Sequence, residues 1–167
     1  SDVIIPLAAL VGFPLCRDAP RDAKEINFEI NDWIAKTKSN DQLVIYPCTN
    51  SGYGTKKDGV CTEESPLNPV SLYGITKVQA ESSFREAENH VTFRLATVVL
   101  YECEFMRNYV HIHDVCRAFR YVLNNWSRCK NETYNVGNDA INMNKLQLAQ
   151  KISEHMPLEI MKAELTS

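Results

Sequence analysis

Apolar residues recur along the chain in two alternating patterns, one typical of buried strands and the other of amphipathic helices. Apolar and β-branched runs predict strands over 2–9, 42–48, 91–99 and 132–136. Between these runs the spacing becomes helical, and a glycine- and proline-rich loop over 52–69 leads into one of the predicted helices. Strands that alternate with helices predict a parallel sheet that is covered on both faces.

Three predicted helices have an apolar face that we expect to point inward. In the helix over 22–38 the face comprises Ile26, Ile30, Trp33 and Ile34. In the helix that starts at His113-Asp114 it comprises Val115, Phe119, Val122, Leu123 and Trp126. The last helix is capped by Asn144 and points Leu146, Ala149 and Ile152 inward.

Composition narrows the class of protein. A chain of 167 residues can bury the core of one ordinary domain. Its net charge of -3 argues against a nucleic-acid surface, for which a basic stripe is expected. The sequence contains no apolar stretch of the ~18 residues that a membrane span requires. It begins without a charged region followed by an apolar signal core, so we expect a cytoplasmic protein.

The six cysteines are even in number, which on its own suggests disulfides. They are widely separated and form no Cys-x-x-Cys, so a zinc ribbon is disfavoured. Reduced thiols are expected for an intracellular chain. Cys48 and Cys116 lie within apolar patterns, where we expect them to be buried as small hydrophobic side chains.

Tyr73, Lys77 and Thr49 are the strongest candidates for chemistry. Tyr73 and Lys77 lie four residues apart, so one helical turn places the phenol and the ammonium on the same face. A cation beside a phenol favours phenolate and would lower the phenol's pKa. Thr49 ends a predicted strand, and its hydroxyl could share a substrate oxygen with the phenol. Together they predict a site that removes the proton of an alcohol while hydride leaves to a cofactor.

These residues resemble the Thr/Ser…Tyr-x-x-x-Lys site of the extended short-chain dehydrogenase/reductase superfamily. The likeness is to its NAD-dependent epimerase/dehydratase branch, which acts on nucleotide sugars. Six blocks follow the branch's order: Leu7-Ala8-Ala9 with Pro6 replacing a histidine, Thr49-x-x-x-Tyr53-Gly54, Glu63-x-x-Pro66-x-x-Pro69-x-x-x-Tyr73-Gly74-x-x-Lys77, Arg94 to Val99, Arg107 to Val115, and Tyr134 to Gly137.

The sequence also departs from the branch. None of its six glycines forms the Gly-x-x-Gly-x-x-Gly turn that holds the cofactor pyrophosphate. A second gap falls near Leu100-Tyr101, and the end stops short of the family's terminal region. We interpret the sequence as joined pieces of a longer protein, the alternative being a truncated one.

The expected fold is α/β: an incomplete Rossmann-like parallel sheet plus part of a small C-terminal substrate-binding region. Residues 1–100 would hold the cofactor and catalytic helix, and 101–167 the remaining packing helix and the partial substrate-binding region.

The resemblance implies roles for individual residues. Tyr73 would be the acid/base, Lys77 would hold the nicotinamide ribose and lower the phenol's pKa, and Thr49 would bind the reacting oxygen. The other cofactor contacts would be Leu7, Ala8, Ala9 and Val98. The substrate contacts would be Thr49, Asn50, Ser51, Thr97 and Arg107, the last meeting the diphosphate. Arg94 is expected to support structure.

The resemblance also narrows the reaction. Sugar 4,6-dehydratases of this branch commonly carry an acid after the Thr, whereas this chain has Asn50 and Ser51. We therefore favour a nucleotide-sugar epimerase or oxidoreductase over a 4,6-dehydratase or reductase of the same family. NAD is the expected cofactor and NADP stays open. A homodimer formed by paired helices is expected by analogy, with no nucleic-acid or membrane partner.

Three other interpretations compete with this one. Tyr73 and Lys77 could be exposed neighbours on a helix, and the chain could be a non-catalytic remnant that acts as a binding or scaffold module. His111, His113 and Asp114 could face a metal ion, because alternate residues of a strand point the same way. The family block already explains His111, and Asp114 resembles a helix start, so we expect no metal site.

Overall fold

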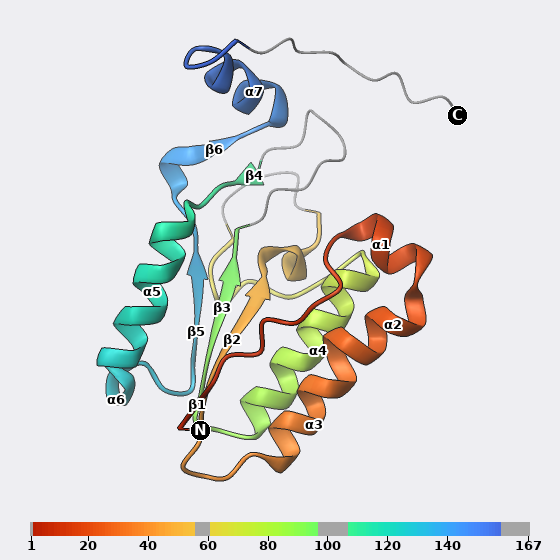
Figure 1. Ribbon diagram of the computed structural model, residues 1–167, viewed down its shortest axis with the longest axis vertical. Coiled ribbons are helices and arrows are strands. Elements are labelled where there is room, and N and C mark those ends of the chain that lie inside the picture. Colours follow the sequence, from red (N-terminus) through yellow and green to blue (C-terminus); the bar gives the residue numbers. More distant parts are fainter. Residues whose placement is uncertain (1, 56–60, 97–106, 158–167) are drawn as a thin grey trace.

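Four parallel strands form the central sheet of the molecule, in the order β1-β2-β3-β5 (Figure 1). The structure is a computed structural model that describes residues 2–55, 61–96 and 107–157. The strands are β1 (Val3–Ile4), β2 (Leu43–Thr49), β3 (His90–Leu95) and β5 (Glu132–Val136). The strands predicted over 42–48 and 132–136 are confirmed. The first strand is shorter than predicted, and 97–99 of the third lie outside the described residues.

Helices cover both faces of the sheet, as predicted. One face carries α1 (Phe13–Asp18), α2 (Pro20–Lys24), α3 (Ile30–Thr37) and α4 (Leu72–Glu86), and the other carries α5 (Ile112–Asn124) and α6 (Trp126–Cys129) (Figure 1). Side chains along β2 point alternately to the two faces of the sheet and so contribute to two hydrophobic cores. Tyr46 packs with α3 and α4, whereas Ile45 packs with α5 and α6. The predicted α/β Rossmann-like architecture is therefore confirmed.

The third crossover of the sheet differs from the first two. The connections from β1 to β2 and from β2 to β3 carry their helices on one face, while α5 lies on the other (Figure 1). The strand order nevertheless advances in the same direction, so the connection from β3 to β5 has the opposite hand. Crossovers in parallel sheets are overwhelmingly right-handed, which makes this change of hand a distinguishing feature of the fold.

A wide π-helical turn, η1 (Glu25–Glu29), joins α2 to α3. The buried residues of this helical run are small or polar and recur at every fourth position: Ala23, Asn27, Asn31 and Ala35. In a regular α-helix this spacing would rotate each successive side chain by about 40°, away from α4. One extra residue in a π turn reverses about 100° of rotation, so the stripe stays against α4.

The apolar face predicted for 22–38 is only partly confirmed for this reason. Ile34 packs against the core and Ile26 is half-buried, but Ile30 and Trp33 are 49% and 63% exposed, while the small stripe takes the inner face. Asn31 also stabilises the wide turn directly, because its side-chain amide donates to the carbonyl oxygens of Ile26 (3.3 Å) and Asn27 (3.1 Å). Hydrogen bonds inside the turn and close packing against α4, rather than hydrophobicity, therefore determine which residues of 22–38 face inward.

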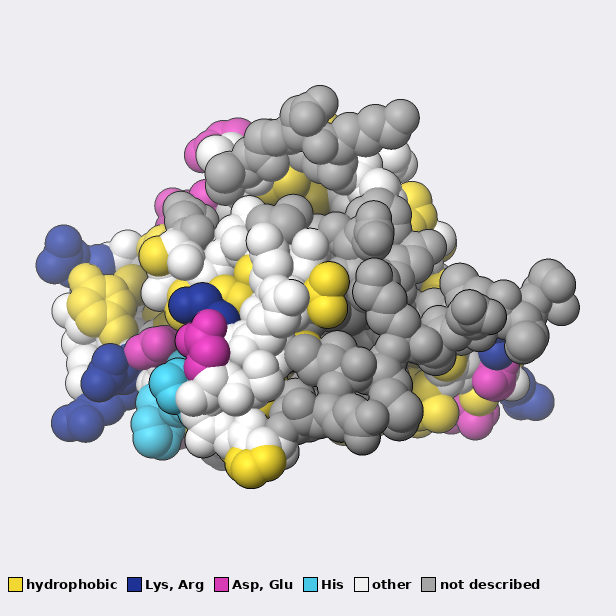
Figure 2. All heavy atoms as spheres, turned by 90° about the horizontal axis from the view of Figure 1, so that it is seen from above, with side chains coloured by type: hydrophobic (Ala, Val, Ile, Leu, Met, Phe, Trp, Pro, Cys, Tyr) yellow, Lys and Arg dark blue, Asp and Glu magenta, His cyan; other side chains and the backbone are white. Residues whose placement is uncertain are grey.

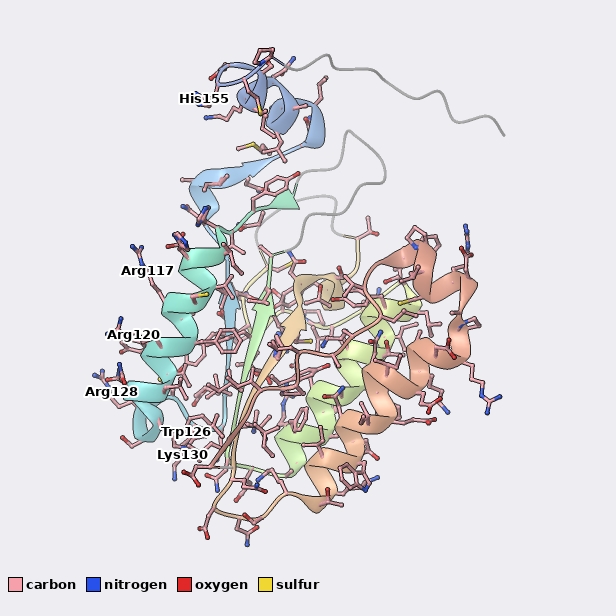
Figure 3. The ribbon with its side chains drawn as sticks, in the orientation of Figure 1. Arg117, Arg120, Trp126, Arg128, Lys130 and His155 are labelled. Carbon is pink, nitrogen blue, oxygen red and sulfur yellow. The ribbon has the colours of Figure 1, made fainter. Side chains whose placement is uncertain are left out.

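The outer face of α5 also differs from expectation. Val122 is buried, but Leu123 is 45% exposed and Cys116 is exposed, so both burial predictions are wrong. The helix begins after His111, not at Asp114, because the His111 imidazole accepts a hydrogen bond from the His113 amide. A set of basic side chains projects away from the sheet along α5 and beyond it: Arg117, Arg120, Arg128 and Lys130 (Figure 3).

A second, two-stranded antiparallel sheet lies beyond the carboxyl ends of the main strands (Figure 1). It consists of β4 (Arg107–Asn108) and β6 (Asn142–Met143), with η3 (Asp139–Ile141) before β6 and α7 (Lys145–Ser153) after it. Asn144 caps α7 in a capping box with Gln147, as predicted, although Ile152 is 39% exposed rather than buried. Within 2–55, 61–96 and 107–157, no helix is long and apolar enough to cross a membrane.

Candidate active site

Thr49 ends β2 at the carboxyl edge of the sheet and is fully buried. Its hydroxyl accepts a hydrogen bond from the Ser51 amide (3.2 Å) and so starts a short 3₁₀ turn, η2 (Asn50–Tyr53). Asn50 and Ser51 are half-buried in this turn, directly after Thr49. The strand end and the turn chemistry together place three predicted site residues at one point.

The N-terminus of α4 packs closely against that turn. Ser71 caps the helix by accepting a hydrogen bond from the Gly74 amide (3.1 Å). A Cβ at Gly74 would lie 3.1 Å from both the Ser51 carbonyl oxygen and the Pro69 Cβ, so the absence of a side chain permits this approach. The glycine after Tyr73 therefore brings α4 against the end of β2.

Tyr73 lies near Thr49, and a side-chain interaction between them acts to lower the pKa of Tyr73. Burial has the larger, opposite effect and, with the nearby Cys48 and Cys16 thiols, raises the pKa of Tyr73 to about 12. The prediction that Lys77 lowers the pKa of this phenol is wrong, because Lys77 is not among the groups that shift it.

Lys77 lies one turn further along α4, on the same inward side, and is 2% exposed. Its Nζ is 4.2 Å from the centre of the Tyr46 ring, while its carbonyl oxygen accepts bonds from the Tyr46 hydroxyl (3.3 Å) and the Cys48 thiol (3.6 Å). Burial lowers the pKa of Lys77 to about 8, with a smaller opposing effect from Cys48. Lys77 is buried and Tyr73 is half-buried, which contradicts the interpretation that they are solvated neighbours on an exposed helix.

Asn27 is a residue of this region that sequence reasoning missed. Its side-chain oxygen accepts a hydrogen bond from the Leu10 amide (2.8 Å), and its amide donates to the Leu10 carbonyl (2.9 Å). The Cys16 thiol donates to the same carbonyl (3.2 Å). We call the two hydrogen bonds between the Asn27 side chain and the Leu10 backbone the Asn27 clamp. The clamp fixes the chain after β1, where the predicted cofactor contacts Leu7, Ala8 and Ala9 lie. Leu7 and Ala8 are exposed and Ala9 is half-buried.

A signal for Asn27 was present in the sequence. Ala23, Asn27, Asn31 and Ala35 recur at a constant spacing of four, so they share one side of the helical run. The larger apolar residues next to them dominated the helical pattern and hid it. A search for small and amide residues at equal spacing would have found the clamp.

A buried ion pair fixes α4 against β3. The Arg94 guanidinium bonds both carboxylate oxygens of Glu81 (2.5 and 3.2 Å), and the two side chains are 3% and 1% exposed. Glu81 follows Lys77 by one helical turn, so the pair holds the face of α4 that carries the candidate site. Arg94 has the structural role that was predicted.

The same guanidinium extends the network to the loop before α4. Arg94 donates to the Tyr53 hydroxyl (2.8 Å) and to the Glu63 carbonyl oxygen (3.1 Å). The Tyr53 hydroxyl donates a hydrogen bond to the side-chain oxygen of Asn135 (2.7 Å), and the backbone amide of Asn135 donates one to the Glu63 carboxylate (2.7 Å). The loop and the ends of β2, β3 and β5 are thus tied together by side chains that are mostly buried.

The remaining predicted residues lie elsewhere or outside the described part. Thr97 and Val98 fall outside the described residues. Arg107 opens β4, where its backbone pairs with Met143. Seen from the carboxyl-end side, histidine and basic side chains gather over α5 (Figure 2). In the part of the chain that the structure describes, no three His, Cys, Asp or Glu residues are placed to hold a metal ion.

A parallel sheet of this order, with a Thr–Tyr–Lys set where β2 meets α4, defines a Rossmann-like protein of the short-chain dehydrogenase/reductase type. More specifically, the chain belongs to the family described as the RmlD substrate binding domain, whose model matches residues 1–112. The predicted superfamily is therefore confirmed.

Solved structures with the same fold include proteins in complex with NAD and a nucleotide sugar. MoeE5, in complex with UDP-glucose and NAD, has a TM-score of 0.81 at 19% identity, over 92% of this chain and 62% of that chain. UDP-glucuronic acid 4-epimerase from Bacillus cereus, with UDP-glucuronic acid and NAD, has a TM-score of 0.80 at 20% identity, covering 92% and 59%. DesIV, a dTDP-glucose 4,6-dehydratase from Streptomyces venezuelae with NAD bound, has a TM-score of 0.79 at 18% identity, covering 92% and 56%. The chain thus spans about three fifths of the length of these proteins.

Proposed function

We propose that this chain is the catalytic-helix part of an NAD(P)-dependent nucleotide-sugar epimerase or oxidoreductase. The observation that carries the proposal is the position of Tyr73 beside the buried Thr49, with Lys77 one turn along on the buried side of α4. The family match and the NAD and nucleotide sugars bound by proteins of this fold support it. Residues 1–100 would form the cofactor and catalytic part, and 101–167 the packing helix and partial substrate-binding region.

The residues of the chain fit such a cofactor and substrate. The segment held by the Asn27 clamp contains the exposed residues Leu7 and Ala8, and Lys77 offers a buried ammonium for a ribose hydroxyl. Bound NAD would supply the hydride acceptor. The proposed cofactor contacts are Leu7, Ala8, Ala9, Tyr73, Lys77 and Val98. The proposed substrate contacts are Thr49, Asn50, Ser51, Thr97 and Arg107.

Tyr73 would move the proton and Thr49 would orient the reacting oxygen. The Thr49 side chain interacts with the phenol, so a sugar oxygen placed between them would meet both groups. The pKa of about 12 keeps Tyr73 protonated at neutral pH, which is the state that donates a proton to a sugar carbonyl. In the opposite direction the phenolate accepts the proton of the sugar hydroxyl.

Among the reactions of this family we favour epimerisation. Asn50 and Ser51 follow Thr49 where a 4,6-dehydratase commonly carries an acid, and elimination of water across two carbons needs that group. An amide and a hydroxyl can bind sugar hydroxyls but do not titrate near neutral pH. Epimerisation needs only that the hydride return to the opposite face of the ketone, and this step requires no further acid.

A screen of UDP- and dTDP-sugars with the natural full-length protein and NAD tests the function. We expect the sugar's proton couplings, followed by NMR, to change to those of an epimer without net loss of NAD. Accumulation of a 4-keto-6-deoxy product would instead assign a dehydratase. Tight nucleotide-sugar binding without turnover of any substrate would support the binding-module alternative and contradict the proposal.

We also propose that the protein is a homodimer paired through α3 and α4. Trp33 and Ile30 on α3 are exposed, and Ile75 on the neighbouring α4 is 38% exposed, so the outer side of the helix pair offers apolar surface. Apolar side chains of this size stabilise an interface when they are removed from water.

Trp33→Asp is therefore expected to convert the dimer into a monomer, because it places a charge in the centre of an apolar interface. Light scattering after size exclusion at micromolar concentration measures the mass. The matched control is Ile112→Asp, which adds the same charge at an exposed apolar position (64%) on α5. A wild-type monomer, or a Trp33→Asp dimer, would exclude pairing through this face.

A further inference from the structure

Tyr46 contacts Lys77 twice, through its ring and through its hydroxyl. The residue lies in the middle of β2, is fully buried, and packs against the Phe84 ring at 5.0 Å. The face of its ring lies 4.2 Å from the Lys77 ammonium, and its hydroxyl donates to the Lys77 carbonyl oxygen (3.3 Å). One aromatic side chain thus contacts the cation and the backbone of the same residue.

No carboxylate serves as the partner of this ammonium. Glu81, the next acidic residue on this side of α4, is bonded to Arg94 and Arg85. Within the described ranges, no ion pair within 4.0 Å includes Lys77. A buried cation without a counter-ion is costly, and an aromatic face is a group that can stabilise it.

The other titratable groups around Lys77 are neutral at physiological pH. Cys48 faces it from β2, and burial raises the pKa of this thiol to about 12. Tyr73 lies one turn earlier on α4, with Cys16 of α1 near it, and its pKa is also about 12. Burial raises the pKa of Tyr46 itself well above its ordinary value, so its ring stays a neutral phenol. The ring face of Tyr46 is the electron-rich group that the structure places against the ammonium, at 4.2 Å.

We propose that Tyr46 is a positioning residue for Lys77, whose ring fixes and stabilises the ammonium beside Tyr73 and whose hydroxyl fixes the turn of α4 that carries it. Its catalytic consequence rests on the proposed function, because Lys77 must stay charged to bind a ribose hydroxyl. The geometric part does not depend on that function.

Direct titration of Lys77 tests the proposal without any substrate. The side-chain signal of Lys77 is followed by NMR in protein carrying isotope-labelled lysine and is assigned by its loss in Lys77→Met. In wild type we expect a pKa of about 8. Tyr46→Leu removes the ring and is expected to lower that pKa by about one unit. Tyr46→Phe keeps the ring and is expected to leave the pKa within about 0.3 unit of wild type.

Phe84→Leu is the matched control for a general loss of packing. Phe84 is buried in the same core cluster and touches Tyr46, yet its ring is not the one that lies over the Lys77 ammonium. We expect it to lower the melting temperature as Tyr46→Leu does, with no change in the pKa of Lys77. An equal pKa shift in Phe84→Leu, or an unchanged or raised pKa in Tyr46→Leu, would overturn the proposal.

Fluorinated phenylalanines at position 46 keep the experiment decisive if Tyr46→Leu fails to fold. One, two and three fluorines withdraw charge from the ring face while its size changes little. We expect the pKa of Lys77 to fall stepwise, and the alkaline limb of turnover to move to lower pH with it. A flat series would refute the role of Tyr46, whereas a stepwise fall in a protein without turnover would sink only the proposed function.

Discussion

Tyr73→Phe is expected to reduce turnover by about 10²–10⁴-fold, the usual contribution of a positioned acid or base. The change removes one oxygen atom, and the ring keeps its place at the start of α4. Without the hydroxyl, the proposed acid/base beside Thr49 could no longer give or take the proton of a sugar oxygen. Steady-state kinetics measure turnover, and calorimetry with the nucleotide sugar measures binding, which we expect to survive within about threefold.

Tyr121→Phe is the matched control for this variant. It deletes the same atom from a tyrosine that is 54% exposed on α5, on the opposite side of the sheet. Its turnover should equal that of wild type. Full activity in Tyr73→Phe would remove Tyr73 from the reaction, and loss of activity in both variants would indicate a general effect of losing hydroxyl groups.

Arg94→Met is expected to cost about 3–5 kcal/mol in the free energy of unfolding, because it leaves the Glu81 carboxylate buried without its main partner. The change also removes the guanidinium that donates hydrogen bonds to the Tyr53 hydroxyl and to the Glu63 carbonyl oxygen. Urea denaturation followed by circular dichroism measures the difference.

Arg85→Met provides the comparison. Arg85 bonds the same Glu81 oxygen (3.0 Å), but its side chain is 58% exposed. Its loss is therefore expected to cost less than about 1 kcal/mol. Replacing both members of the buried pair, as in Glu81→Leu with Arg94→Met, should recover part of the stability, because no unpaired charge is left. Equal destabilisation by Arg94→Met and Arg85→Met would contradict a dominant role for the buried pair.

The sequence contained the sheet and the centre of the candidate site. Continuous apolar runs are characteristic of strands buried on both faces, and β2 and β5 follow those runs closely. Thr49, Tyr73 and Lys77 could be brought together because each depends on a local rule: a strand end, a helix start, and a spacing of one turn. Local rules of this kind survive folding.

The properties that sequence reasoning missed depend on neighbours far away in the chain. The inward face of 22–38 was set by the close approach of α4 and by the Asn31 bonds inside η1. The pKa of Tyr73 was predicted from one adjacent cation, whereas burial and two distant thiols set it. Tyr46 was counted only as part of a strand, since nothing local showed that its ring would face Lys77.

The π turn also limits how this region can change. Asn27 lies inside η1, so the residue that clamps Leu10 and the helix that packs along α4 share one backbone irregularity. An uninterrupted α-helix could place Asn27 against Leu10, or it could keep the small residues against α4. It could not do both, because the side-chain direction would rotate steadily along the helix. We therefore expect point substitutions in this segment to be tolerated far better than the deletion of a single residue, and natural length variation to avoid positions 25–29.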